Sequence, residues 1–322
     1  MNALKPLKID IVSDVVCPWC YIGKKRIESA LALVPDVPVE VTWRPFFLNP
    51  WVPREGISRE DYLTTKFGSV DAYKGIAGRV VVAAGEEGLT YRPELVRRQP
   101  NTIDCHRLIH WADAQGKAAE MKQRLMELYF RDGGDLTEGD VLVQAASDVG
   151  LDADDVRRRL ATDEDVALIS GWAQEASDKG ISGVPTFVFA QKYAISGAQA
   201  PELLARAIRQ VSAEVNAQAA EMKQRLMELY VRDGGDLTEV DVLVQAASDV
   251  GLDADDVRRR LATDEDVALI SGWAQEASDK GISGVPTFVL AQKYAISGAQ
   301  APELLARAIR QVSAEVNAQA AE

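Results

Sequence analysis

The chain has 322 residues, of which 47% are hydrophobic and 26% charged, and it carries a net charge of −13. This composition is typical of a globular protein and excludes a disordered or fibrous chain. No apolar run is long enough to cross a membrane and no basic face is concentrated, so we predict no membrane and no nucleic-acid partner. The first residues show no secretory leader and three cysteines are too few for a disulfide framework, which predicts a cytoplasmic protein.

The first fifty residues predict a strand, a helix and a second strand. Alternating apolar residues indicate a buried strand over residues 7–14, and a helix begins at Pro18, where the missing N–H of proline would be unpaired in any case. The second strand covers residues 39–43. From about 57 to 180 the periodicity is helical, with breaks at glycine and proline.

Two short strands at 186–189 and 193–195 flank a turn and predict a hairpin, and a last helix begins at Pro201. The order is therefore strand, helix, strand, helical block, strand, strand, helix. Without the block, this is the minimal thioredoxin arrangement. We predict an α/β protein with a thioredoxin-like fold, an inserted α-helical domain, and a duplicated helical and hairpin segment.

The duplication is a long internal repeat, in which residues 118–218 recur as 219–319. A period of 101 residues is far longer than the roughly 20 to 50 residues of a solenoid unit, so this is a duplicated segment. The second copy has neither a cysteine nor a strand-helix-strand opening. It is half a domain. Only three positions differ between the copies: Phe130 and Val231, Gly139 and Val240, Phe189 and Leu290.

We predict four segments: an opening half at 1–50, a helical insertion at 51–180, a closing half at 181–218, and the second copy at 219–322. Between Pro201 and about Arg232 there is neither glycine nor a further proline, which predicts one long helix joining the copies. Two closing halves compete for one opening half. Copy one follows the preceding helices directly, so we predict that it completes the domain. The half left over predicts association between chains, by exchange of halves or homo-oligomerisation through the second copy.

The motif that carries chemistry is Cys17-Pro18-Trp19-Cys20. Cys17 lies where a strand ends and a helix begins, so free backbone N–H groups and the helix dipole favour its thiolate. We predict that Cys17 is the nucleophile and that Cys20, one turn deeper, resolves the mixed disulfide. The following cations, Lys24, Lys25 and Arg26, are expected to be solvated helix residues.

The sequence disfavours two other interpretations of this cysteine pair. The pair could have arisen by chance in a buried helix, which the strand and the proline at the helix start disfavour. A zinc site would need four ligands, and only Cys105, His106 and His110 remain as candidates, without a second Cys-x-x-Cys. We therefore predict no metal, and Cys105 is expected to be a buried, apolar side chain.

The second part of the site is expected in the loop Gly183-Val184-Pro185-Thr186, just before the hairpin. A proline here commonly only blocks an extra pairing edge. In the thioredoxin arrangement, however, a cis proline at this point faces the dithiol and leaves the preceding backbone free to bind an extended substrate. Because the dithiol is present, we predict the functional role for Pro185 and Val184.

Five motifs occur in order along the chain: Ser13-Asp14-Val15-Val16-Cys17-Pro18-Trp19-Cys20-Tyr21-Ile22-Gly23, Pro100-Asn101-Thr102, His106-Arg107, Gly183-Val184-Pro185-Thr186 and Ser196-Gly197-Ala198-Gln199. Together they resemble the FrnE-like branch of the DsbA superfamily, over residues 1 to about 218. The resemblance implies disulfide exchange at Cys17 and Cys20, with Pro185 in cis. It also implies a substrate pocket lined by Pro18, Trp19, Val184, Asn101 and His106, although Asn101 is equally suited to cap the following helix.

Two residues depart from DsbA itself: Trp19 stands where DsbA has His, and Ile11 where it has a buried acid. Both argue against strong oxidase behaviour. We predict a disulfide oxidoreductase or isomerase that acts on protein or small thiol and disulfide substrates, with no cofactor beyond its own dithiol and glutathione as a candidate co-substrate. The reducing cytosol favours reductase or isomerase work.

Two alternatives remain at this stage. One is a glutathione-dependent isomerase of the 2-hydroxychromene-2-carboxylate type, in which a serine takes the place of the first cysteine. The other is a non-enzymatic binding module, because the duplicated half exposes a groove or edge that suits a partner.

Overall fold

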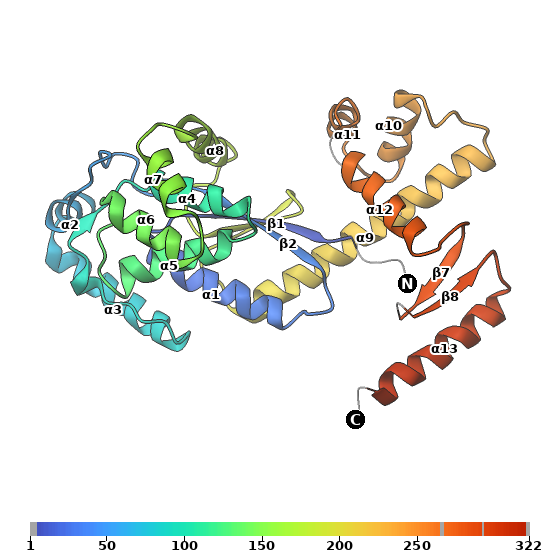
Figure 1. Ribbon diagram of the computed structural model, residues 1–322, viewed down its shortest axis with the longest axis horizontal. Coiled ribbons are helices and arrows are strands. Elements are labelled where there is room, and N and C mark those ends of the chain that lie inside the picture. Colours follow the sequence, from blue (N-terminus) through green and yellow to red (C-terminus); the bar gives the residue numbers. More distant parts are fainter. Residues whose placement is uncertain (1–4, 265–266, 292, 320–322) are drawn as a thin grey trace. The chain divides into compact units, whose positions relative to one another are not determined.

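The computed structural model describes residues 5–264, 267–291 and 293–319. The chain divides into two compact units (Figure 1): an N-terminal unit, Lys5–Val215, and a C-terminal unit that begins at Asn216. Among the described helices, none combines the length and the apolar character that a membrane span requires.

The N-terminal unit is built on a four-stranded sheet in the order β2-β1-β5-β6. Strand β1 pairs in parallel with β2, with Leu7 opposite Val39, and antiparallel with β5, with Ile9 opposite Phe189. Since β5 and β6 are the hairpin of copy one, the prediction that copy one completes the domain is confirmed. The strands are β1 (Leu7–Ser13), β2 (Val39–Pro45), β5 (Thr186–Phe189) and β6 (Tyr193–Ser196).

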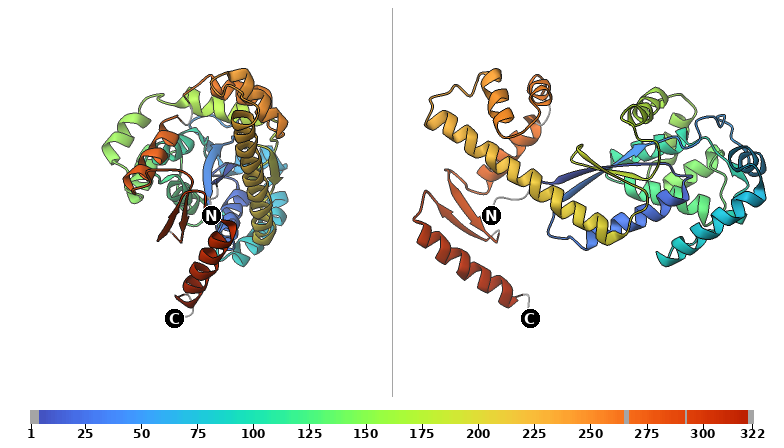
Figure 2. Two further views of the ribbon diagram at one scale, coloured as in Figure 1. Left: turned by 90° about the vertical axis from the view of Figure 1, so that its right-hand side faces the viewer. Right: turned by 180° about the vertical axis from the view of Figure 1, so that it is seen from behind.

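Helix α1 (Pro18–Ala32) and the first part of α9 (Pro201–Val231) cover one face of this sheet (Figure 2). Side chains alternate across a strand, so every second residue of β1 and β5 faces these helices. The core they form is apolar and almost fully buried, and it packs the later turns of α1 against the sheet. Its residues include Leu7, Ile9, Ile11, Ile27, Phe187, Phe189, Leu204 and Ile208.

The insertion between β2 and β5 is helical, as predicted, apart from one short ladder. Strand β3 (Ile57–Ser58) pairs antiparallel with β4 (Arg98–Gln99). Two-residue strands are too short to show an alternating pattern, which is why the sequence did not indicate them. The helices are α2 (Arg59–Phe67), α3 (Val70–Glu86), α4 (Ile103–Asp113), α5 (Ala118–Phe130), α6 (Gly139–Asp148), α7 (Ala153–Leu160) and α8 (Val166–Asp178), with a 3-10 turn at Pro93–Leu95.

The C-terminal unit repeats the elements of copy one from α6 to β6 with boundaries shifted by 101 residues, whereas the equivalent of α5 is the last part of α9. Helix α9 runs without a break from Pro201 to Val231, which confirms the predicted long helix. Strands β7 and β8 form a two-stranded sheet of their own within the described residues. The remaining elements are α10 (Val240–Asp249), α11 (Ala254–Leu261), α12 (Val267–Asp279), β7 (Thr287–Leu290), β8 (Tyr294–Ser297) and α13 (Pro302–Gln319).

Candidate active site

Cys17 is the residue before the first turn of α1, with an extended backbone (φ −91°, ψ 114°) and Pro18 at the first helical position. The backbone N–H groups of Cys20 and Tyr21 already donate to its carbonyl, at 3.0 and 3.2 Å. Its thiol is buried and donates to the carbonyl oxygen of Val184 at 3.6 Å. Trp19, between the two cysteines, is 38% exposed and marks the side of the dithiol that faces solvent.

The two thiols of the motif have opposite pKa shifts. The pKa of Cys17 is lowered because the Cys20 thiol donates a hydrogen bond to its sulfur and the N–H groups of Cys20 and Trp19 add to this, against burial and the negative charge of Asp14. The pKa of Cys20 is raised well above its usual value by burial and by its bond to Cys17. Cys17 is therefore the thiol that ionises first.

The loop before β5 lies directly against the start of α1. The Val184–Pro185 peptide bond is cis, as the resemblance implied, and Val184 presents its carbonyl to Cys17. Gly23 makes the close approach possible: a Cβ atom there would lie 2.7 Å from Cγ of Pro185. The fold thus brings Cys17 next to Val184 and Pro185, which lie more than 160 residues further along the sequence.

Three buried polar residues lie deeper: Asp14, His106 and Lys122. Asp14 accepts a hydrogen bond from the backbone N–H of Leu48 through Oδ2 at 2.8 Å, and its Oδ1 lies 3.4 Å from His106 Nε2. Three atoms of this group have no hydrogen-bond partner among the described residues: Oδ1 of Asp14, Nε2 of His106 and Nζ of Lys122. The Lys122 ammonium lies 5.2 Å from the ring of Trp43.

Burial dominates the electrostatics of this group. It lowers the pKa of Lys122 to about 8, although the charges of Cys20 and Asp14 act in the opposite direction. It also lowers the pKa of His106, so this imidazole is neutral at neutral pH, although Asp14 acts in the opposite direction. Lys122 and Cys20 act on each other: the positive charge of Lys122 lowers the pKa of Cys20, and so favours the thiolate that the resolving step requires.

Residues 8–209 match the DSBA-like thioredoxin domain, and residues 210–310 match it a second time. The chain belongs to the DsbA-like thioredoxin domain family. Thiol-disulfide oxidoreduction is the general role of this family. The second match covers the duplicated half, which lacks the cysteine pair of the family.

Three known proteins are similar to this DsbA-like chain. The probable DsbA oxidoreductase of Streptomyces coelicolor is 34% identical, with a TM-score of 0.60 over 65% of this chain and 91% of that one. The uncharacterized protein YwbO of Bacillus subtilis is 27% identical over 203 residues, which are 62% of this chain and 94% of YwbO. A candidate protein disulfide isomerase from Nitrosomonas europaea shares the fold, with 14% identity and a TM-score of 0.52 over 65% and 98% of the two chains.

The structure corrects the interpretation of Lys24 as a solvated residue. Lys24 is buried, pairs with Glu28 on the next turn, and places its Nζ 5.9 Å from the Trp43 ring. It lies one turn after Cys20, on the side of α1 that packs against the fold, and the sequence did not reveal that side. Lys25 is exposed as predicted. Arg26 is half-buried and donates to Glu87 and to the carbonyl of Ala198, both at 2.6 Å.

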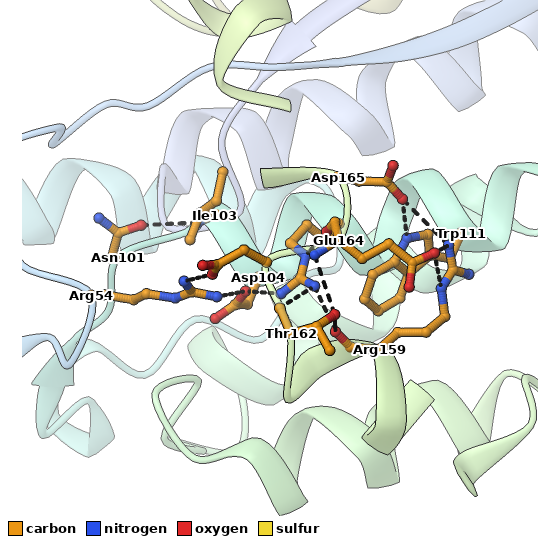
Figure 3. Close-up of polar contacts among 11 residues, drawn as sticks. Arg54, Asn101, Ile103, Asp104, Trp111, Arg159, Thr162, Glu164 and Asp165 are labelled. Carbon is orange, nitrogen blue, oxygen red and sulfur yellow. Dashed lines mark hydrogen bonds and ion pairs between the residues drawn. The ribbon is translucent and has the colours of Figure 1, made fainter. Parts of the chain in front are cut away.

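Asn101 uses its side-chain amide within the protein (Figure 3). It donates to the carbonyl of Val52 at 2.7 Å. It also accepts from the N–H of Ile103 at 3.1 Å, at the start of α4, which is the contact drawn in Figure 3. The helix-capping alternative therefore describes its contacts. His106 contacts Asp14 and packs edge-on against Phe47, with ring centroids 5.8 Å apart. Its side chain is buried.

Arg107, the partner of His106 in the family motif, is fully buried and anchors α4 to the loop between α7 and α8. It donates to the carbonyl oxygens of Arg159, Thr162 and Glu164 at 2.6 to 2.8 Å and pairs with Asp104 (Figure 3). Its contacts hold the helix that carries His106.

Asp14 and Lys122 are the site residues that sequence reasoning missed. Asp14 belongs to the family motif, but nothing in a single sequence indicates that its carboxylate is buried. For Lys122 a weak signal exists: it lies four residues before Met126, on the apolar side of α5. A partly enclosed cavity of about 100 Å³ reaches both His106 and Lys122, and its lining includes Arg44 and Trp172. Cys105 is fully buried with a raised pKa, as expected for an apolar role.

Proposed function

We propose that this DsbA-like protein exchanges disulfides through Cys17, with Cys20 as the resolving thiol. The main support for this proposal is that the two thiols differ in pKa and in position. Cys17, at the start of α1, has the lowered pKa and faces the Val184 carbonyl, whereas Cys20 is deeper and has the raised pKa. A low-pKa thiol at a helix start with a second thiol one turn below suits attack followed by resolution.

In the reducing direction, the Cys17 thiolate attacks one sulfur of a substrate disulfide. A mixed disulfide with Cys17 forms, and the other substrate sulfur leaves as a thiolate, which takes up a proton. Cys20 then loses its proton and attacks the Cys17 sulfur, which releases the second substrate thiol. Two electrons and two protons have moved to the substrate, and the protein holds a Cys17–Cys20 disulfide.

The substrate is expected to bind beside Trp19 and the Val184–Pro185 loop. Trp19 supplies exposed apolar surface, and the backbone around Val184 suits an extended peptide or the peptide-like backbone of glutathione. We therefore propose protein or small disulfides as substrates and glutathione as a co-substrate. Thiols supply both electrons, so the cycle requires no further cofactor and no metal.

Lys122 supports the second step. Attack by Cys20 requires its thiolate, and burial opposes that charge. The positive charge of the Lys122 ammonium offsets part of this penalty. An isomerase of the 2-hydroxychromene-2-carboxylate type is not favoured, because Cys17 occupies the position of its serine and has a lowered pKa.

The test is turnover of a peptide disulfide with glutathione as the reductant. Cys17→Ser is expected to reduce the rate to that measured without protein. Cys20→Ser should accumulate a mixed disulfide on Cys17, visible as added mass. Cys105→Ser is the matched control and should keep the wild-type rate, because Cys105 is buried with a raised pKa.

Retained turnover in Cys17→Ser would contradict the proposed mechanism. Conversion of 2-hydroxychromene-2-carboxylate in the presence of glutathione, without disulfide exchange, would favour the isomerase alternative. Absence of both activities would leave the binding module.

A further inference from the structure

The second copy exposes apolar side chains that the first copy buries. Ile208 on α9 is 0% exposed, whereas its equivalent Ile309 on α13 is 55% exposed; Ile169 is 1% and its equivalent Ile270 is 59% exposed. In copy one, β1 and α1 cover the face that contains Ile208. No second opening half exists in the chain, so this face of copy two is an unfilled interface.

The edge of β7 is part of that interface. The N–H of Gly298 donates to the carbonyl of Pro286 at 2.8 Å, so Pro286 faces β8. Backbone groups alternate in direction along an antiparallel strand, which turns Phe288 toward β8 and Val289 toward the outer edge. In copy one the same edge of β5 pairs antiparallel with β1. In the described part of the chain, β7 pairs with β8 and with no other strand.

Exchange of halves between chains does not satisfy this edge. Every chain brings one opening half and two closing halves, so any exchange leaves one closing half per chain without a partner. The half that remains can always meet an identical half from another chain. A two-fold axis places two copies of one strand antiparallel, which is the orientation this edge has in copy one. The strand, Thr-Phe-Val-Leu, carries no charge to oppose such pairing.

We propose that two chains associate through their second copies, with β7 of one pairing antiparallel with β7 of the other. The product is a four-stranded sheet in the order β8-β7-β7-β8. Phe288 and Leu290 project to the same face of each β7, because side chains alternate along a strand. Pairing therefore places the apolar residues of both strands side by side and satisfies the outward backbone groups of Val289 in both chains.

Register partners in the hairpin provide a matched pair of variants. Val289 lies opposite Ala295, and the alternation directs the N–H of Val289 to the β7 edge and that of Ala295 to the β8 edge. Proline at either position leaves the bonds between β7 and β8 intact, since it removes only an outward N–H. Val289→Pro should block the proposed interface, and Ala295→Pro should not.

The measurement is the molar mass of the full chain in solution by light scattering after gel filtration. The wild type and Ala295→Pro are expected at twice the 35.1 kDa of one chain, and Val289→Pro at 35.1 kDa. Val289→Lys keeps the N–H but places like charges at the interface, and should also give single chains. The thermal unfolding of the N-terminal unit should be the same in all four proteins.

Three results would overturn the proposal: a wild type of single-chain mass at all concentrations, a two-chain mass in Val289→Pro, or loss of the two-chain mass in Ala295→Pro. A two-chain mass in Val289→Pro would assign the association to another surface, exchange of halves included.

Discussion

The two copies of the repeat have nearly the same sequence and form the same local structure, but they differ in what they bury. Asp152 caps α7 by accepting from the N–H of Asp155, and Asp253 caps α11 by accepting from Asp256, both at 2.7 Å. Yet Lys122 is buried whereas its equivalent Lys223 is exposed. Caps and periodicity act within a few residues, whereas the burial of Lys122 comes from packing within the N-terminal unit, Trp43 included.

Two of the three positions at which the copies differ in sequence also differ in burial. Phe130 is buried and stacks on Tyr21 of α1, with ring centroids 5.5 Å apart, whereas Val231 is 78% exposed. Phe189, opposite Ile9 of β1 in the sheet, is fully buried, and copy two has Leu290 at this position. Both large aromatic side chains belong to the copy that packs against the opening half. The Gly139 and Val240 difference lies at the first residue of a helix, and no tertiary contact explains it.

The largest effect on stability is expected from truncating one buried isoleucine in each copy. Ile208→Ala should lower the free energy of unfolding of the N-terminal unit by about 2–5 kcal/mol, because a fully buried side chain leaves a cavity. Ile309→Ala removes a side chain that is 55% exposed. This variant should change the free energy of unfolding by less than about 0.5 kcal/mol. Denaturant unfolding of both variants measures the difference. Equal effects would show that the opening half does not distinguish the copies.

A smaller effect, of about 1–3 kcal/mol, is expected from the lysine pair. Lys122→Met removes a buried charge without a hydrogen-bond partner among the described residues, so it should raise stability at pH 7. The pKa of Lys122 is about 8 in the folded protein and 10.5 ordinarily. The unfolded chain holds this proton more tightly, so wild-type stability rises between pH 8 and 10.5, and the advantage of Lys122→Met shrinks there.

The same variant tests the catalytic role of Lys122. Without its charge the pKa of Cys20 rises, so Lys122→Met should resolve the mixed disulfide on Cys17 more slowly while being more stable. Lys223→Met, at an exposed position, should change neither property. Resolution at the wild-type rate in Lys122→Met would restrict this lysine to a structural role.

The smallest effect on catalysis is expected from removing copy two altogether. A protein that ends at residue 218 retains the complete sheet and both cysteines, and should exchange disulfides at the wild-type rate. It lacks β7 and should be a soluble single chain, which light scattering measures. An insoluble or inactive product would show that the second copy is integral to the fold.

Much of the fold could be predicted because it depends on local patterns. Short stretches of sequence are enough to predict the strand before Cys17, the helix start at Pro18, the hairpin and the unbroken α9. The structure contains each of them. That Pro185 faces Cys17 follows from the thioredoxin arrangement of the predicted elements. The ladder between β3 and β4 was missed because two residues carry no periodicity.

The sequence by itself determined the helices, the strands and the dithiol at a helix start, because propensity, capping and proline geometry act over a few residues. Tertiary structure alone decided which buried charged groups act on the two thiols. Lys122 and Lys223 stand in nearly identical local sequence, so no local rule separates them. Packing within the N-terminal unit, Trp43 included, buries Lys122, and this burial is the main cause of its lowered pKa of about 8.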